Sequence, residues 1–118
     1  MQYMLMCCFD EEAWDKLPDA QRETIMREYG GLIQSLASKG CLRGGGRLHR
    51  ISSATTVRMQ NGKPVVTDGP FAETKEQLGG YHVIECGNLD EAISIAARIP
   101  TLPAGGTIEV RPVAETEC

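Results

Sequence analysis

The chain has 118 residues, of which 42% are hydrophobic and 24% are charged. This composition is typical of one folded domain and excludes disordered or collagen-like chains. Twelve Lys and Arg against sixteen Asp and Glu residues give a net charge of -4, which argues against a surface that binds nucleic acid or anionic lipid directly. The longest apolar run, residues 3–9, is far shorter than the roughly 20 residues that cross a bilayer, and no basic segment of a signal peptide precedes it. We expect one cytoplasmic domain over residues 1–118.

The five cysteines form no recognisable framework. Their number is odd, and neither a Cys-x-x-Cys pair nor a zinc-finger spacing occurs. Adjacent Cys7 and Cys8 fall in a strand-like stretch, where their side chains point to opposite faces and cannot share one metal ion. We therefore expect reduced cysteines that fill space as small apolar side chains, and no metal or cofactor.

The first predicted element is a strand over residues 2–8. Both of its faces are apolar, with Met4, Met6 and Cys8 on one and Tyr3, Leu5 and Cys7 on the other. Such a strand needs a cover on each side. The chain's own helices can provide one cover, and we infer that a second copy of the chain provides the other.

Two helical segments follow. Asp10 is placed to cap a short turn over residues 11–16, and Pro18 opens a longer helix that Gly40 ends. Apolar side chains recur along the longer helix at the spacing of one face, at Ile25, Tyr29, Leu32, Ile33 and Leu36. The pair Gly30-Gly31 costs about 1 kcal/mol per residue relative to alanine. Close packing on a sheet is the favoured reason, and a kink is the alternative.

A glycine-rich segment, residues 41–50, comes next, with three consecutive glycines between Arg43 and Arg47. Glycine amides beside arginines can form an anion-binding nest. The segment lacks the Gly-Lys-Ser/Thr ending of a phosphate loop and does not open a helix after a strand. A flexible connection is therefore favoured, with a weak anionic ligand or an acidic partner surface as the alternative.

The remaining pattern predicts three more strands and a helix before the last strand. Residues 55–59 and 64–67 form a hairpin around Asn61-Gly62, and residues 80–86 form another strand. Asn88 with Glu91 makes a capping box that opens a helix through residue 99. Residues 107–113 form the last strand, which Pro112 marks as an edge.

This order is β-α-β-β-β-α-β. Apart from the additional hairpin strand, it predicts an α+β fold of the ferredoxin-like type, an antiparallel sheet with two main helices on one face. Because the opposite face is left uncovered, we expect a homodimer, of which a dimeric α/β barrel is the commonest form.

The most unusual local chemistry surrounds Asp68, which stands at the end of an apolar strand. Gly69 and Pro70 fix the turn after it, and the ionisable Glu73, Lys75 and Glu76 follow closely. Such a cluster can shift the pKa of a carboxyl group in either direction. In the alternative interpretation Asp68 bonds the amides of its own turn and the charges form a solvated loop.

The pattern as a whole resembles the DGPF-type branch of the YCII-related domain family. The resemblance covers nearly the whole chain and is carried by Thr55–Arg58, Val66–Tyr81, Asn88–Ala92, Ala96–Pro100 and Ile108–Pro112. It implies a ferredoxin-like dimeric α/β barrel, a His–Asp pair in a cleft, and an association with extracytoplasmic-function sigma factors and transcription initiation.

Asp68 is the position that the resemblance makes the candidate acid/base. The chain departs from the family pattern in its histidine. The first long helix contains none, and the two histidines are His49 and His82. If the His82 face of its strand lines a dimer cleft, His82 meets Asp68 across neighbouring strands and carries the proton. If that face packs on helices, His82 is a partly buried structural histidine. The candidate ligand-binding residues are Arg58, Glu73, Lys75 and Tyr81.

Two functions fit these features. In the first, a homodimer binds a small polar molecule in a cleft near Asp68 and carries out acid/base chemistry of a hydrolase- or isomerase-like kind, without a metal or cofactor. In the second, a non-catalytic interaction protein presents a surface to a sigma factor or another transcription protein, and the Asp-Gly-Pro-Phe turn is structural. Both share one fold, so the fold does not choose between them.

Overall fold

The computed structural model describes residues 1–115. The elements in chain order are β1 (Gln2–Phe9), α1 (Glu11–Asp15), α2 (Asp19–Ser38), β2 (Leu42–Arg47), the short 3₁₀ turn η1 (Ile51–Ser53), β3 (Thr55–Gln60), β4 (Lys63–Asp68), β5 (Gln77–Glu85), α3 (Leu89–Ala96) and β6 (Thr107–Pro112). Within residues 1–115, no helix has the length and apolar character needed to cross a membrane.

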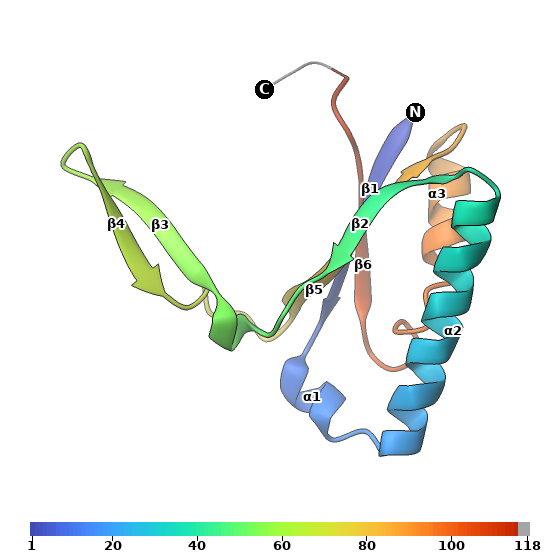
Figure 1. Cartoon of the computed structure of the whole chain (residues 1–118), viewed down its shortest axis with the longest axis horizontal. Coiled ribbons are helices and arrows are strands. Elements are labelled where there is room, and N and C mark those ends of the chain that lie inside the picture. Colours follow the sequence, from blue (N-terminus) through green and yellow to red (C-terminus); the bar gives the residue numbers. More distant parts are fainter. Residues whose placement is uncertain (116–118) are drawn as a thin grey trace.

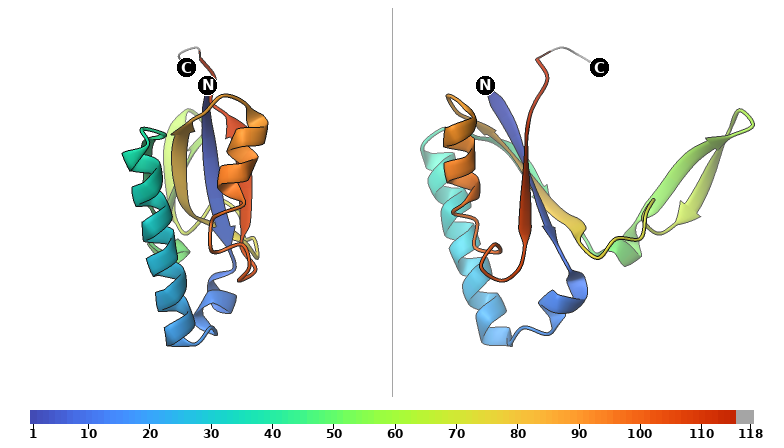
Figure 2. Two further views of the ribbon diagram at one scale, coloured as in Figure 1. Left: turned by 90° about the vertical axis from the view of Figure 1, so that its right-hand side faces the viewer. Right: turned by 180° about the vertical axis from the view of Figure 1, so that it is seen from behind.

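Four strands form one antiparallel sheet in the order β2-β5-β1-β6. Helices α2 and α3 lie together on one face of this sheet (Figures 1 and 2). The sheet order and the placement of the helices confirm the predicted α+β, ferredoxin-like architecture. Strand β6 lies at an edge, as Pro112 indicates.

The core lies between the sheet and the two helices. Leu5, Ile84 and Ile99 are its largest fully buried side chains. The predicted alternation of β1 is confirmed, because its odd-numbered side chains from Tyr3 to Cys7 pack with α2 and α3, whereas the even-numbered ones are half-buried on the other face. Burial of each aliphatic side chain stabilises the folded state by about 1.5–3 kcal/mol. A shift of β1 by one residue would turn these side chains away from the helices and lose that stabilisation.

The glycine-rich segment is a strand rather than the flexible connection that its composition predicts. Leu42–Arg47 forms β2 and pairs with β5. At Gly45 an added Cβ would lie 2.6 Å from the carbonyl oxygen of Tyr81 and 2.8 Å from Nδ1 of His82. Glycine is needed there because the two backbones approach so closely, although its strand propensity is low.

The β3–β4 hairpin is a separate two-stranded sheet and not an additional strand of the main one. It projects away from the body of the molecule (Figures 1 and 2). Positive φ angles at Asn61 (51°) and Gly62 (76°) confirm the predicted turn. Val57, Met59 and Val66 are 64%, 71% and 64% exposed, so the hairpin has an apolar face that no part of residues 1–115 covers.

Two helical details differ from expectation. Helix α3 ends at Ala96 rather than at residue 99, because the residue before Pro100 disfavours helical backbone and the chain tightens into three-residue turns. Helix α2 continues through Gly30 and Gly31, and a Cβ added at either would meet nothing within 4 Å. Close packing on the sheet is therefore the wrong explanation for these glycines.

Candidate functional site

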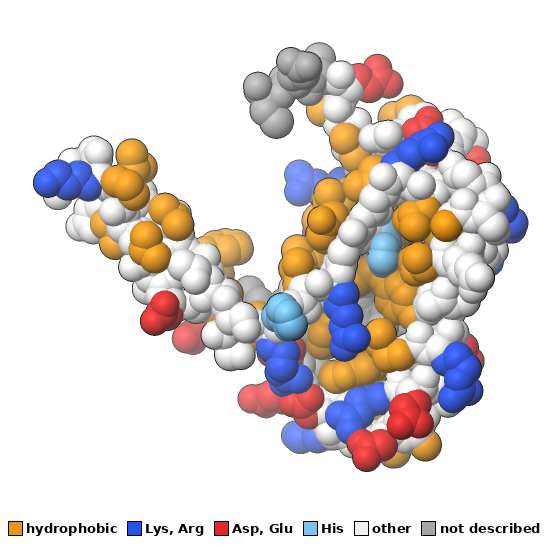
Figure 3. Space-filling model, viewed as in Figure 1, with side chains coloured by type: hydrophobic (Ala, Val, Ile, Leu, Met, Phe, Trp, Pro, Cys, Tyr) orange, Lys and Arg blue, Asp and Glu red, His pale blue; other side chains and the backbone are white. Residues whose placement is uncertain are grey.

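A cavity of about 340 Å³ opens between the sheet and helix α2. Its walls come from β1, β5 and β2 on one side and from α2 on the other, and α1 and residues 47–50 border its mouth. Figure 3 looks into this hollow, where apolar side chains and an imidazole are visible between the strands and the long helix. The apolar lining residues are Phe9, Trp14, Met26, Ile33 and Leu48.

A row of three polar side chains crosses the inner wall of the cavity. Cys7 of β1 and His82 of β5 lie on the helix-facing side of the sheet, and Tyr29 reaches them from α2. The Tyr29 hydroxyl is 3.0 Å from Sγ of Cys7 and 2.5 Å from Nε2 of His82. The tyrosine and histidine rings are tilted by 53° with their centroids 5.4 Å apart. We call these residues the Cys7–Tyr29–His82 row.

Burial keeps all three members of this row neutral. It lowers the pKa of His82 from 6.5 and raises the pKa values of Cys7 and Tyr29. The hydrogen bond to Cys7 raises the Tyr29 pKa further. At neutral pH the row is thus a thiol, a phenol and an imidazole. A neutral imidazole accepts a hydrogen bond at one nitrogen, so the Tyr29 hydroxyl can donate to Nε2 while it accepts from the Cys7 thiol.

Glycines leave the cavity open. Gly30, Gly46, Gly79 and Gly80 all border it. A Cβ at Gly79 would lie 2.0 Å from the Phe9 ring, so this position requires glycine for packing. Gly30 has no such restriction, because open space surrounds it. Gly30 therefore has room for a side chain of its own that would occupy the cavity.

Ion pairs hold the segment at the mouth of the cavity against helix α1. The Arg50 guanidinium donates to both carboxylate oxygens of Asp15, at 2.9 and 2.7 Å. This bond also lowers the pKa of Asp15. The backbone N–H of Ile51 donates to Oε2 of Glu11 at 3.0 Å, and Nε of Arg50 lies 3.7 Å from Oε1 of the same residue.

The structure does not bring Asp68 to His82 within one chain. Asp68 ends β4, which pairs with β3 alone, and its exposed carboxylate makes no side-chain hydrogen bond or ion pair with residues 1–115. His82 lies on β5, on the face that packs against α2. The idea that the two residues meet across neighbouring strands is therefore wrong for the single chain. Asp68 does not cap the amides of its own turn either, since Gly69 N–H donates to Ala54.

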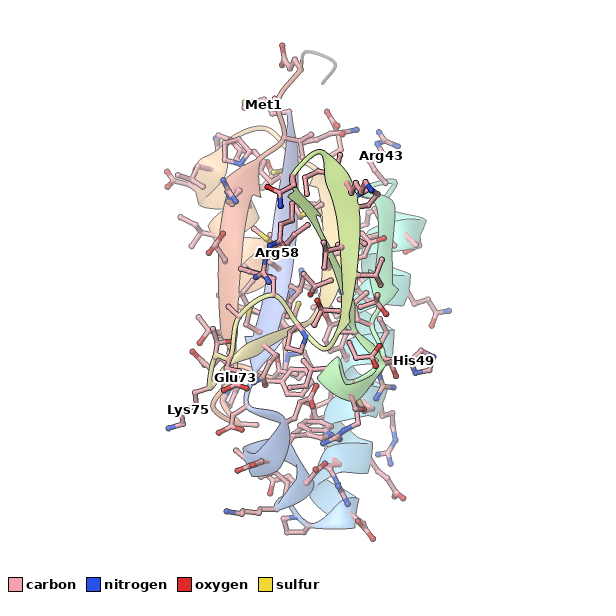
Figure 4. All side chains as sticks on the ribbon, turned by 90° about the vertical axis from the view of Figure 1, so that its left-hand side faces the viewer. Met1, Arg43, His49, Arg58, Glu73 and Lys75 are labelled. Atoms are coloured by element: carbon pink, nitrogen blue, oxygen red, sulfur yellow. The ribbon has the colours of Figure 1, made fainter. Side chains whose placement is uncertain are left out.

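The candidate ligand-binding residues also lie outside the cavity. Arg58 donates to the carbonyl oxygen of Phe71 at 2.9 Å and so secures the base of the hairpin. Glu73 and Lys75 are exposed on the loop that follows β4 (Figure 4). Tyr81 is on the face of β5 opposite to His82. None of these four residues lines the cavity, so their ligand-binding role stays a prediction.

Sequence reasoning assigned two members of the row, Cys7 and Tyr29, to the apolar core. Both residues do lie on the predicted apolar faces, but their polar atoms also form hydrogen bonds that the apolar pattern does not predict. The usable signal was a hydroxyl on the buried face of α2, since a tyrosine in that position needs a hydrogen-bond partner. Within residues 1–115, no three His, Cys, Asp or Glu side chains are grouped to hold a metal ion.

Known proteins resemble this chain along nearly its whole length. Residues 1–117 match the YCII-related domain. The chain belongs to the YCII-related domain family. It is 40% identical over 118 residues to the uncharacterized protein R00369 of Rhizobium meliloti (strain 1021), covering 97% of this chain and 93% of that protein.

A solved structure with the same fold is 5-chloro-2-hydroxyhydroquinone dehydrochlorinase (TftG) from Burkholderia phenoliruptrix AC1100, in complex with 2,5-dihydroxybenzoquinone. The TM-score is 0.53 at 16% identity, and the match covers 98% of this chain and 96% of that one. At this identity the likeness establishes the fold alone.

The depressed pKa of His82 makes stability depend on pH. The unfolded chain binds a proton at His82 more readily than the folded protein does, so the free energy of unfolding should fall as pH drops below about 6.5. His82→Gln should remove this component, whereas His49→Gln, at an exposed position, should retain it. Urea denaturation at several pH values around 6.5 measures the slope. Equal slopes in all three proteins would contradict the assignment.

Proposed function

We propose that this protein binds a small molecule in the cavity and transfers a proton through the Tyr29–His82 pair. One observation carries the proposal: an open cavity exposes a hydrogen-bonded row of neutral acid/base groups on its inner wall. Buried polar groups that have only a structural role are usually surrounded by packed side chains. Here they face space that a ligand can enter.

The row is suited to general acid/base chemistry. As a substrate proton moves to the Tyr29 oxygen, the phenolic proton can move to Nε2 of His82, which leaves an imidazolium and a substrate anion. Return of the proton to a different substrate atom would complete an isomerisation. Because burial disfavours the imidazolium, the proton should be returned readily. Cys7 positions the phenol by its contact with the hydroxyl.

An enzyme-like role is compatible with one of the solved structures that share this fold. That structure is a dehydrochlorinase in complex with 2,5-dihydroxybenzoquinone. We further assign the chain to the DGPF-type branch of its family, on the strength of the Asp68–Phe71 motif. The alternative function is a non-catalytic partner of a sigma factor or another transcription protein, in which case the cavity would have no ligand.

We also propose that the functional unit is a homodimer. The hairpin apolar face consists of Val57, Met59, Pro64 and Val66, which share one side of the β3–β4 ladder. A two-stranded hairpin has little stability of its own in water, so this face needs a cover. The main sheet has a second apolar surface, because Met4, Met6 and Val83 lie on its side away from the helices. A two-fold pair of chains covers both surfaces on both copies.

Dimerisation would place Asp68 at the interface between two copies of the chain. Asp68 lies on the same side of the hairpin as Val57 and Met59, because Thr55 pairs with Asp68 and side chains alternate along each strand. Docking of the hairpin apolar face therefore carries Asp68 to the interface. We propose that its predicted acid/base role, with Arg58, Glu73, Lys75 and Tyr81 as ligand-binding groups, belongs to this boundary between two copies.

Sedimentation equilibrium tests the dimer. The wild-type chain should sediment at micromolar concentration with about twice the chain mass of 12.9 kDa. Met59→Asp should give monomers, because it places a charge on the hairpin apolar face. Gln60→Asp, on the opposite side of the same strand, should remain dimeric. A monomeric wild-type protein would overturn the proposal.

Filling the cavity tests ligand binding. Gly30 shares a helical face with Met26 and Ile33, so Gly30→Leu should extend into the cavity while it gains about 1 kcal/mol of helix propensity. Gly31→Leu gains the same propensity outside the cavity and is the matched control. In a thermal-shift screen of small metabolites, ligands should stabilise the wild type and Gly31→Leu but not Gly30→Leu.

The same screen separates the two functions and the two candidate regions. Loss of stabilisation in Asp68→Ala alone would move the site from the cavity to the dimer boundary. If no compound stabilises the wild type, the ligand-binding function is wrong and the interaction protein is favoured.

Proton transfer is tested on a ligand that carries an exchangeable C–H bond. In D₂O the protein should speed deuterium incorporation at that carbon, which NMR measures as loss of the proton signal. Tyr29→Phe should slow the incorporation by about 100-fold or more. Tyr3→Phe removes the hydroxyl of a core tyrosine outside the cavity and should leave the rate unchanged. Equal rates in all three proteins would exclude the relay.

A further inference from the structure

The cavity has a cationic group on the same face as its polar row. Arg47 pairs with Gly80 in the β2–β5 ladder, and Gly80 also pairs with Cys7. His82 lies two residues from Gly80 along β5, so the Arg47 side chain belongs to the helix-facing side of the sheet together with Cys7 and His82. Arg47 borders the cavity near its mouth. Figure 3 shows basic side chains at the rim of this hollow.

This arginine is electrostatically uncompensated within residues 1–115. The ion pairs of the described chain engage Arg50, Arg22, Arg111 and the N-terminal ammonium group, whereas Arg47 has no carboxylate within ion-pair distance. Its neighbour at the mouth, Arg50, is neutralised by Asp15 and lies near Glu11. Among the arginines that border the cavity, Arg47 is thus the one without an ion-pair partner in residues 1–115.

The balance of charge at the mouth favours a monoanion. Glu11 also borders the cavity, and its carboxylate would repel a doubly charged phosphate group. Within residues 1–115, Arg47 and Arg50 are the arginines that border the cavity, and Arg50 is already paired with Asp15. His49 also borders the cavity. A single guanidinium binds a carboxylate well, because two parallel N–H donors match its two oxygens.

Between the mouth and the row, the cavity is aromatic and apolar. Phe9 and Trp14 pack with ring centroids 6.0 Å apart and a tilt of 53°, and Met26 and Ile33 face them from α2. A volume of about 340 Å³ is at the small end for ligand pockets. Aromatic and sulfur-containing walls of this size suit one ring rather than an extended chain.

We propose that the ligand of this cavity is a small ring-containing monocarboxylic acid with a hydroxyl or carbonyl group at its opposite end. The carboxylate binds Arg47 at the mouth, the ring fills the apolar middle, and the polar end meets Tyr29 and His82. This inference rests on the proposed function and names its ligand class. It also assigns Arg47 as the specificity-determining residue that selects acids over neutral analogues.

A matched pair of compounds tests the inference: 4-hydroxybenzoate as the acid and 4-hydroxybenzamide as its neutral analogue. Each is titrated into ¹⁵N-labelled protein, and Kd is taken from the shifts of amide signals. The acid should bind the wild type at least about tenfold more tightly, because a charge-assisted pair is lost in the amide. Arg47→Gln should abolish this preference. Arg27→Gln removes the same charge from the outer side of α2, away from the cavity, and should retain it.

The outcomes separate this inference from the proposed function. Equal affinities for acid and amide in the wild type, with both lost in Gly30→Leu, would overturn the assignment of Arg47 and leave the cavity as the binding site. Preference for the acid that survives in Arg47→Gln would also overturn it. If neither compound binds at millimolar concentration, the proposed ligand class is wrong. The metabolite screen with Gly30→Leu and Gly31→Leu then tests the proposed function independently.

Discussion

The space between the sheet and helix α2 depends on how side-chain size changes along the helix-facing side of β5. Ile84 is fully buried, His82 is half-buried, and Gly80 has no side chain at all. At the Ile84 end the helices pack directly on the sheet and form the core. At the Gly80 end the same two layers enclose a cavity. One strand thus supplies both the packing that stabilises the fold and the opening that gives it a site.

The polar row lies at the boundary between these two regions. On the core side Leu5 and Ile84 exclude water, and on the other side the cavity admits it. Burial of this degree holds the imidazole, the phenol and the thiol neutral, because a low-dielectric surrounding disfavours charge. The unpaired charge of Arg47 lies toward the opening. In the proposed binding mode, the neutral groups inside and the cation at the mouth would orient an anionic molecule with its polar end inward.

The β3–β4 hairpin is a separate structural unit of the same chain. Its apolar side and the outer side of the sheet are both left without a cover inside residues 1–115. In the proposed two-fold dimer each copy would cover the apolar surfaces of the other, so the stability of the fold would depend on assembly. Asp68 lies on the apolar side of the hairpin, and residues 68–71 do not line the cavity, so the Asp68–Phe71 motif and the cavity occupy different regions of the fold.

Local patterns in the sequence determined most of the elements. The alternation in β1, the helical spacing in α2, the Asn61-Gly62 turn and the Asn88 cap depend on neighbours a few residues away. For that reason the fold class and the elements around these signals could be predicted. The positions of β2 and of the hairpin could not, because they depend on pairing between distant segments. In the sequence, Gly45 predicts a flexible segment. Only the structure shows that β5 approaches this position too closely for a side chain.

The site also depends on contacts between segments that are distant along the chain, so only the tertiary structure shows it. Cys7, Tyr29 and His82 are separated by 22 and 53 residues along the chain, and only the packing of α2 on the sheet brings their polar atoms together. Asp68 stands out in the sequence because its motif is contiguous. The sequence by itself determined which residues alternate, cap and turn. Tertiary structure decided which of them share a cavity, because hydrogen bonds and empty space depend on distances in three dimensions that spacing along a chain does not encode.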